Sequence, residues 1–181
     1  MKIQDGTGTG RLAKVNAKQR LDVTAATITQ RALTAVLDAK TFTWTTSWSA
    51  DTGEYIMYIK NTSKTRLLFI DKVTVNSVNA GLFELFQVTG TPAGSIITGK
   101  NTNLTSSNSA DAVSYADAEV TGLTESGRID LARTPANGRA DMELQDVLVL
   151  GLGNAIGLKY TGATGLVDVI ITGYFEVEED L

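Results

Sequence analysis

Apolar and polar residues alternate with a period of two along several segments of the chain, the pattern of a half-buried β-strand. The longest alternation covers residues 167–177, where valine, isoleucine, glycine and phenylalanine hold one face and aspartate, threonine and glutamate recur on the other. In residues 41–48, Trp44 and Trp48 share one face, while threonine and serine take the opposite face. Residues 54–61 are apolar on both faces, which predicts a central strand that is covered on both sides.

Glycine, asparagine, aspartate and proline divide the chain after residue 40 into further short β segments. We expect a long strand at 66–78, short strands at 118–123 and 128–131, and turns at 133–139 and 151–157. This gives about eight to ten strands at spacings of about 8–15 residues, with no alternation of strands and helices. The predicted fold class is all-β, an antiparallel β-sandwich with jelly-roll topology favoured and an up-and-down barrel as the alternative.

Residues 89–117 form the main irregular region of the sequence. We expect turns over 89–94, a brief strand at 95–98, and then a long polar loop that contains a single aromatic residue, Tyr115. A loop of this length inside a compact domain is typically functional or disordered. Two interpretations stay open: the loop wraps over a neighbouring subunit, or it is a surface loop without a partner.

The first residues of the chain differ in composition from the rest. Three glycines alternate with other residues in the first ten positions, at Gly6, Gly8 and Gly10, and such a stretch does not pack a core by itself. A P-loop is excluded because no Gly-Lys-Thr/Ser sequence follows. We predict an extended N-terminal arm over residues 1–38, with a short helix at 30–37 as the alternative, and a β-sandwich domain over residues 39–181.

Composition removes most catalytic chemistries from consideration. The 181 residues include no His and no Cys, which excludes serine–His and cysteine–His hydrolases, zinc hydrolases and disulfide frameworks. The 25 threonines fit a chain of many strands. A formal net charge of −4 argues against a general nucleic-acid binder, and no apolar run approaches the roughly 18 residues of a membrane span. We expect synthesis in a cytoplasm, with no nucleic-acid or membrane partner.

Two residue patterns resemble functional sites, but their surroundings indicate structural roles. The spacing Gly151-x-Gly153-x-x-x-Gly157 is followed by a strand-like segment, whereas a dinucleotide site requires a helix there. Asp141, Glu143 and Asp146 lie on one predicted strand, whereas a glycosidase needs two carboxylates from separate elements across a cleft. We therefore expect no enzyme activity, no catalytic or metal-binding residues and no cofactor.

Three segments carry short motifs in a recognisable order. Residues 5–21 contain Gly-Thr-Gly, then Ala-Lys-Val, a polar break and Arg-Leu. Residues 41–75 contain a Thr-rich strand, the sequence YIKN, a polar turn and a hydrophobic strand. Residues 89–117 form a Thr-Gly-rich loop. In these segments the chain resembles a group of small virion proteins of tailed bacteriophages. It departs from their NLNxxS loop ending at residues 101–105, and its C-terminal third matches only in β character.

The resemblance implies a bacteriophage structural protein with no catalytic residues. The favoured function is capsid decoration, as a cement protein on the head surface of the virion, whose partners are the major capsid protein and other copies of itself in a homotrimer. The alternative is a tail, fibre or receptor-binding component that contacts the host surface through the loop. The candidate partner-binding residues come from the arm and the loop: Gly6, Gly8, Gly10, Arg11, Lys14, Asn103, Leu104 and Tyr115.

Overall fold

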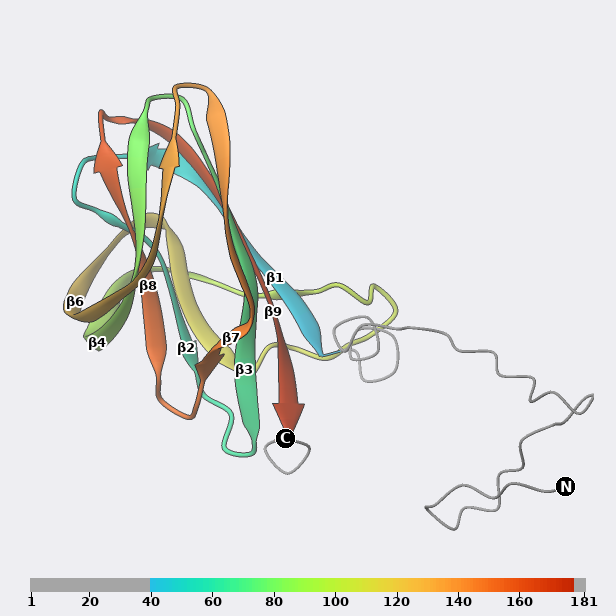
Figure 1. The fold of residues 1–181 in the computed structure, drawn as a ribbon. Helices are drawn as coiled ribbons and strands as arrows, with labels where there is room; N and C mark the ends of the chain where they lie inside the picture. Colours follow the sequence, from blue (N-terminus) through green and yellow to red (C-terminus); the bar gives the residue numbers. More distant parts are fainter. Residues whose placement is uncertain (1–39, 178–181) are drawn as a thin grey trace, which may run out of the picture.

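The computed structural model describes residues 40–177, and this part of the chain is entirely β and turn structure, with no helix (Figure 1). Nine strands follow one another along the chain: β1 (Thr41–Ala50), β2 (Tyr55–Asn61), β3 (Arg66–Ser77), β4 (Gly81–Ile97), β5 (Lys100–Asn101), β6 (Ala112–Thr134), β7 (Gly138–Leu150), β8 (Ala155–Gly162) and β9 (Gly165–Val177). The predicted arm over residues 1–38 lies outside the described residues.

The strand order is that of a jelly roll. One sheet has the order β5-β1-β9-β3-β7, and the second set, β2-β6-β4-β8, closes into a barrel. All neighbouring strands are antiparallel. From β1 to β4 and from β6 to β9, each strand lies in the other set from the strand before it, so the chain winds back and forth between two layers. The predicted antiparallel sandwich is confirmed, and the up-and-down alternative is wrong because β1 does not pair with β2.

The main core fills the space between the two layers. Trp44 is fully buried and Trp48 packs against the same cluster, as the alternation in β1 predicted. Buried aliphatic and aromatic side chains from both layers meet there, among them Phe42, Leu68, Ile70, Val73, Val75, Val167, Val169, Ile171 and Phe175, facing Ile56, Ile59, Phe83, Leu85, Leu158 and Tyr160.

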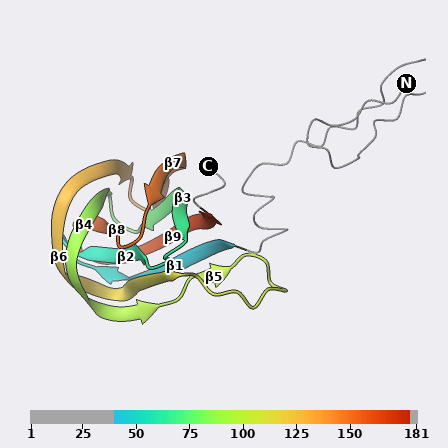
Figure 2. The ribbon, with the colours of Figure 1, turned by 90° about the horizontal axis from the view of Figure 1, so that it is seen from below.

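The barrel closes because β4 and β6 are long and bent. β6 pairs with β2 through residues 112–115 and with β4 between residues 114 and 134, so the β4–β6 ribbon curls round (Figure 2). The barrel holds a second, smaller core of side chains from all four of its strands: Tyr58, Phe86, Val88, Val120 and Ala155.

The sequence prediction was wrong about residues 89–94 and about β6. The Gly-Thr-Pro segment is part of β4, and the two strands expected at 118–123 and 128–131 are one strand. Gly90 (φ 111°) and Gly122 (φ 77°) face one another across the ribbon, and a Cβ on Gly90 would lie 2.3 Å from the Gly122 carbonyl oxygen. Glycine adopts the backbone angles of a bulge as readily as those of a turn. Because β4 and β6 stay paired on both sides of these glycines, the two strands bend here and continue.

Both shorter predicted turns are present with narrower bounds, 135–137 and 151–154, because the flanking residues belong to β6, β7 and β8. Asn137 adopts a positive φ of 52° in the tight turn between β6 and β7. Gly153 adopts a φ of 80° in the turn between β7 and β8. The segment after this turn is strand β8, so the helix that a dinucleotide site requires does not follow the glycines.

Candidate interaction surface

A polar loop over residues 98–111 projects from the sandwich beside the beginning of β1 (Figures 1 and 2). Its two-residue strand β5 pairs with Phe42 and Thr43 of β1. The backbone N–H and the hydroxyl of Thr102 both donate to the carbonyl oxygen of Thr41, at 2.9 and 3.2 Å. These contacts fix the base of the loop to the edge of the sheet.

Short polar side chains determine the course of the loop. The Asn101 side-chain oxygen accepts from the backbone N–H of Asn103 at 2.9 Å, and the Asn103 side-chain oxygen accepts from the backbone N–H of Thr105 at 3.1 Å. The Asn103 carbonyl oxygen also accepts from the backbone N–H of Ser106 at 3.0 Å. Asparagine side chains that bond the backbone two residues later imitate a turn. Asn103 therefore holds the loop in shape.

Leu104 is the apolar side chain that this arrangement exposes. It is 93% exposed, more than any other large apolar residue of the described chain. Burying a leucine side chain on a partner contributes about 1.5–3 kcal/mol relative to leaving it in water. The Asn101 and Asn103 side chains hold the backbones of Asn103 and Thr105, on either side of Leu104. Leu104 is thus positioned as an anchor for a partner surface.

The base of the loop contacts a residue that sequence reasoning did not assign to the loop. A Cβ added to Gly99 would lie 2.6 Å from Cε2 and 2.6 Å from Nε1 of Trp44. The Trp44 indole is fully buried, so the Gly99 backbone contacts a closely packed part of the core in which side chains cannot shift. Nothing in the sequence indicated this contact, because the two residues are far apart in the chain.

The described part of the chain begins next to the loop. The Lys40 carbonyl oxygen accepts from the backbone N–H of Phe175 at 3.0 Å, immediately before β1 begins. Lys40 also lines a shallow cavity together with Asp111, at the end of the loop, and Arg66, which forms an ion pair with Asp111 at 3.3 Å. The predicted arm residues Gly6, Gly8, Gly10, Arg11 and Lys14 lie outside the described residues.

The placement of Tyr115 in the loop was wrong. Tyr115 belongs to β6, where it pairs with Tyr58 of β2 and Ile96 of β4. Its ring contacts the Tyr58 ring edge-on, with centroids 6.0 Å apart, and it packs against the second core. Burial of the Tyr58 side chain is the main cause that raises its pKa, and the electrostatic effect of Tyr115 raises it further. The loop ends at residue 111 because the next residues are needed to close the barrel on β2.

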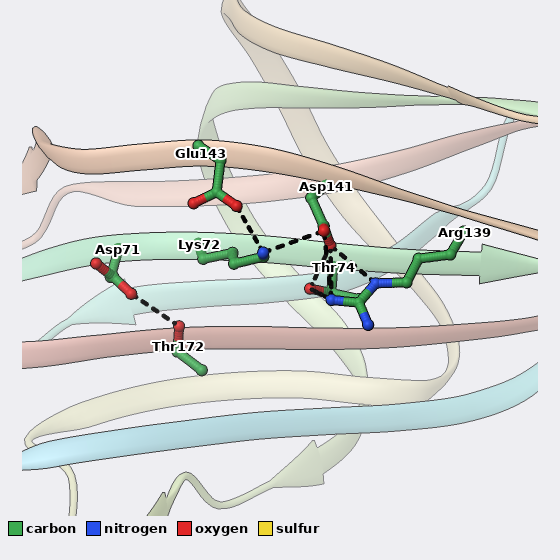
Figure 3. Close-up of polar contacts among 7 residues, drawn as sticks. All are labelled: Asp71, Lys72, Thr74, Arg139, Asp141, Glu143 and Thr172. Atoms are coloured by element: carbon green, nitrogen blue, oxygen red, sulfur yellow. Dashed lines mark hydrogen bonds and ion pairs between the residues drawn. The ribbon is translucent and has the colours of Figure 1, made fainter.

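The carboxylates of β7 form a cross-strand network with β3 (Figure 3). Asp141 accepts from the hydroxyl of Thr74 at 2.7 Å and pairs with Lys72 and Arg139 at 3.1 Å each. Glu143 pairs with Lys72 at 2.5 Å. The Thr74 hydrogen bond, followed by those of Lys72 and Arg139, lowers the pKa of Asp141 to about 2.

An ionised carboxylate with cationic neighbours does not act as a general acid near neutral pH, because that role needs a raised pKa. The network of Asp141 and Glu143 is therefore a structural link between two strands. The side chain of Asp146, the third candidate of this strand, lies outside the described part of the structure.

Among the described side chains of residues 40–144 and 147–177, no group of three acidic residues is arranged to hold a metal ion. In the same range there is no helix with the length and apolarity that crossing a bilayer requires.

Comparison with known proteins adds no family to these observations. No protein-family model matches the chain, and no curated protein is significantly similar to it.

Proposed function

We propose that this protein is a virion structural protein of a tailed bacteriophage, and that it decorates the capsid as a cement protein. The observation that carries the proposal is the loop over residues 98–111, which is fixed to β1 and presents Leu104 with 93% of its surface exposed. The resemblance of residues 5–117 to small virion proteins gives the proposal its direction. The partners are the major capsid protein and further copies of this chain on the head surface.

The place where the described chain begins supports the same function. Lys40 follows the predicted arm in the sequence and the loop is bonded to Thr41, so the described chain begins at the end of the sandwich where the loop with Leu104 lies. Two weak contacts on one surface act with an effective concentration that makes the joint affinity exceed either contact alone. In a closed homotrimer each subunit repeats this pair of contacts, which multiplies the effect.

A tail or receptor-binding component is the second candidate, through contact of the loop with host glycan or protein. Glycan sites commonly stack sugar rings on exposed aromatic side chains. In residues 40–177 the large apolar side chains that are well exposed are all aliphatic, and Tyr115 packs against the second core. These side chains favour the head-binding function over the glycan-binding one.

The experiment is a binding assay with capsids that lack the protein. Full-length protein and two variants are mixed with the capsids, and the bound fraction is measured after sedimentation. Leu104→Asp places a charge where a partner would bury the leucine, and we expect affinity to fall by about ten-fold or more, since about 1.5–3 kcal/mol of burial is lost.

Leu166→Asp is the matched control. Leu166 is 46% exposed and pairs with Ser49 near the far end of β1. We expect this variant to bind as the unmodified protein does. Equal affinity of all three proteins, or binding to tails with none to heads, contradicts the proposed head-binding function.

A further inference from the structure

One edge of the first sheet has no strand paired with it over most of its length, and β6 contacts this edge through the Thr46–Asp117 hydrogen bonds. β1 pairs with β9 through all ten of its residues, from Thr41 to Ala50. On its other side, only Phe42 and Thr43 are covered, by the two residues of β5. Within the described chain, residues 44–50 therefore form an open strand edge.

The direction of the backbone groups on this edge follows from two hydrogen bonds. The Lys40 carbonyl faces β9, where it accepts from Phe175, and the Thr41 carbonyl faces away from β9, where it accepts from Thr102. Because backbone groups alternate in direction along an antiparallel strand, the odd-numbered residues face the open edge. The unpaired residues among them are Thr45, Ser47 and Ser49, and all three are exposed.

The open edge lacks the devices that usually prevent strand addition. Edge strands are commonly protected by charged side chains, proline or bulges. β1, with the sequence TFTWTTSWSA, has no charge, no proline and no register shift against β9. The opposite edge strand, β7, carries Arg139, Asp141 and Glu143, and a bulge of residues 144–147 interrupts its pairing with β3.

An anionic groove lies against the same edge. Its walls come from β1, β6 and β9: Thr45, Thr46, Ser47, Asp117, Asp168, Val169 and Ile170. The Thr46 hydroxyl donates to Asp117 at 2.6 Å, and the Ser47 hydroxyl donates to Asp168 at 2.6 Å. No lysine or arginine of the described chain lines the groove, so a segment that lies there meets two carboxylates held in place by β1.

The N-terminal segment of the chain has the complementary charge. Residues 1–39 contain six Lys or Arg and three Asp or Glu, a net charge of +3, whereas residues 40–177 contain ten and fourteen, a net charge of −4. Within this basic segment, residues 21–29 read LDVTAATIT, which is rich in β-branched residues and free of glycine and proline. These nine residues carry one aspartate and no cation, and the positive charges next to them are Arg20 and Arg31, which flank the stretch. This composition suits an added strand.

A second copy is a better source of this strand than the same chain. The segment enters β1 at Lys40, and a direct return along the edge would run into Phe42 and Thr43, whose edge is already held by β5. Residues 30–40 span at most about 36 Å when extended, so residues 21–29 are able to leave the edge of their own chain. We propose that residues 21–29 of one copy add as a β-strand to the open edge of β1 in a second copy. This inference does not depend on capsid binding.

Because the chain has no cysteine, disulfide trapping tests the arrangement directly. Ser47→Cys is made in one full-length preparation, and Thr24→Cys, Thr27→Cys and Thr29→Cys are made in three others. Each arm variant is mixed with the Ser47 variant and oxidised, and peptides from the two chains joined by a disulfide are quantified by mass spectrometry. Neighbouring strands bring Cα atoms to about 4.5–5.5 Å, within the range of a disulfide.

The matched control is Ser126→Cys, which places a thiol on an exposed residue of β6. At one or more arm positions, we expect at least about ten-fold more interchain disulfide with Ser47→Cys than with Ser126→Cys, as effective concentration predicts. Equal amounts for all three arm positions overturn the proposal. A further preparation carries Ser47→Cys and one arm cysteine in the same chain. If it forms only intrachain disulfides, the proposal is also overturned, since the chain then covers its own edge. Unchanged urea midpoints verify that the variants fold.

Discussion

Replacing Gly99 by alanine tests whether the loop is fixed to the core through Trp44. The new Cβ would lie 2.6 Å from two atoms of an indole that is 0% exposed, well inside van der Waals contact. Such overpacking of a filled core costs about 1–3 kcal/mol. For a domain of this size, the loss corresponds to a fall of roughly 3–10 °C in Tm.

The matched control is Gly127→Ala, because a Cβ at Gly127 has no heavy atom within 4 Å and this glycine has an ordinary φ. We expect the control to be neutral, or stabilised by about 0.4–1 kcal/mol through the unfolded chain. Urea unfolding followed by the fluorescence of Trp44 and Trp48 measures both variants. If Gly99→Ala unfolds at the same midpoint as Gly127→Ala, the contact with Trp44 does not hold the base of the loop.

Two further substitutions test the polar contacts of the sheet. The pKa of Asp141 lies at about 2, below its usual 3.8, so its contribution to stability is present above about pH 4 and is lost as pH falls through 2. Asp141→Asn should therefore cost about 1 kcal/mol at pH 7, after allowance for solvent screening, and much less at pH 2. A pH-independent difference in the free energy of unfolding would refute this. The Thr46 hydroxyl bonds both the carboxylate and the backbone N–H of Asp117, whose φ is +61°, so Thr46→Val should lower stability by about 1–3 kcal/mol. Thr45→Val, on the exposed face, should change it by less than about 0.5 kcal/mol in the same urea titration.

The glycines and proline of residues 89–94 show how a prediction from local sequence alone fails. Thr-Gly-Thr-Pro is turn chemistry when read alone, yet β4 continues through it because β6 is paired with it on the far side. Positive φ at Gly90 serves a bulge as well as it serves a turn. Local composition identifies a residue that bends the backbone, and only the pairing partner decides whether the strand ends there.

The candidate interaction surface was predicted in part. The loop and the residues Asn103 and Leu104 were selected from composition, because a long polar stretch inside a compact domain is noticeable in any sequence. Tyr115 was assigned to the loop for the same reason, and this was wrong because its ring belongs to the second core. Gly99 was missed, since its role depends on an indole more than fifty positions earlier in the chain.

The sequence alone determined the β character of this protein, the inward face of β1 and β9, and the absence of histidine and cysteine chemistry. These features depend on local alternation and composition, which any strand carries in its own residues. The tertiary structure alone decided which strand edges are covered. It pairs β1 with β9 and leaves the other edge of residues 44–50 unpaired, and it places Thr45 and Ser47 in the groove that Asp117 and Asp168 also line. Strand order depends on contacts between residues far apart in the chain, and no local pattern records them.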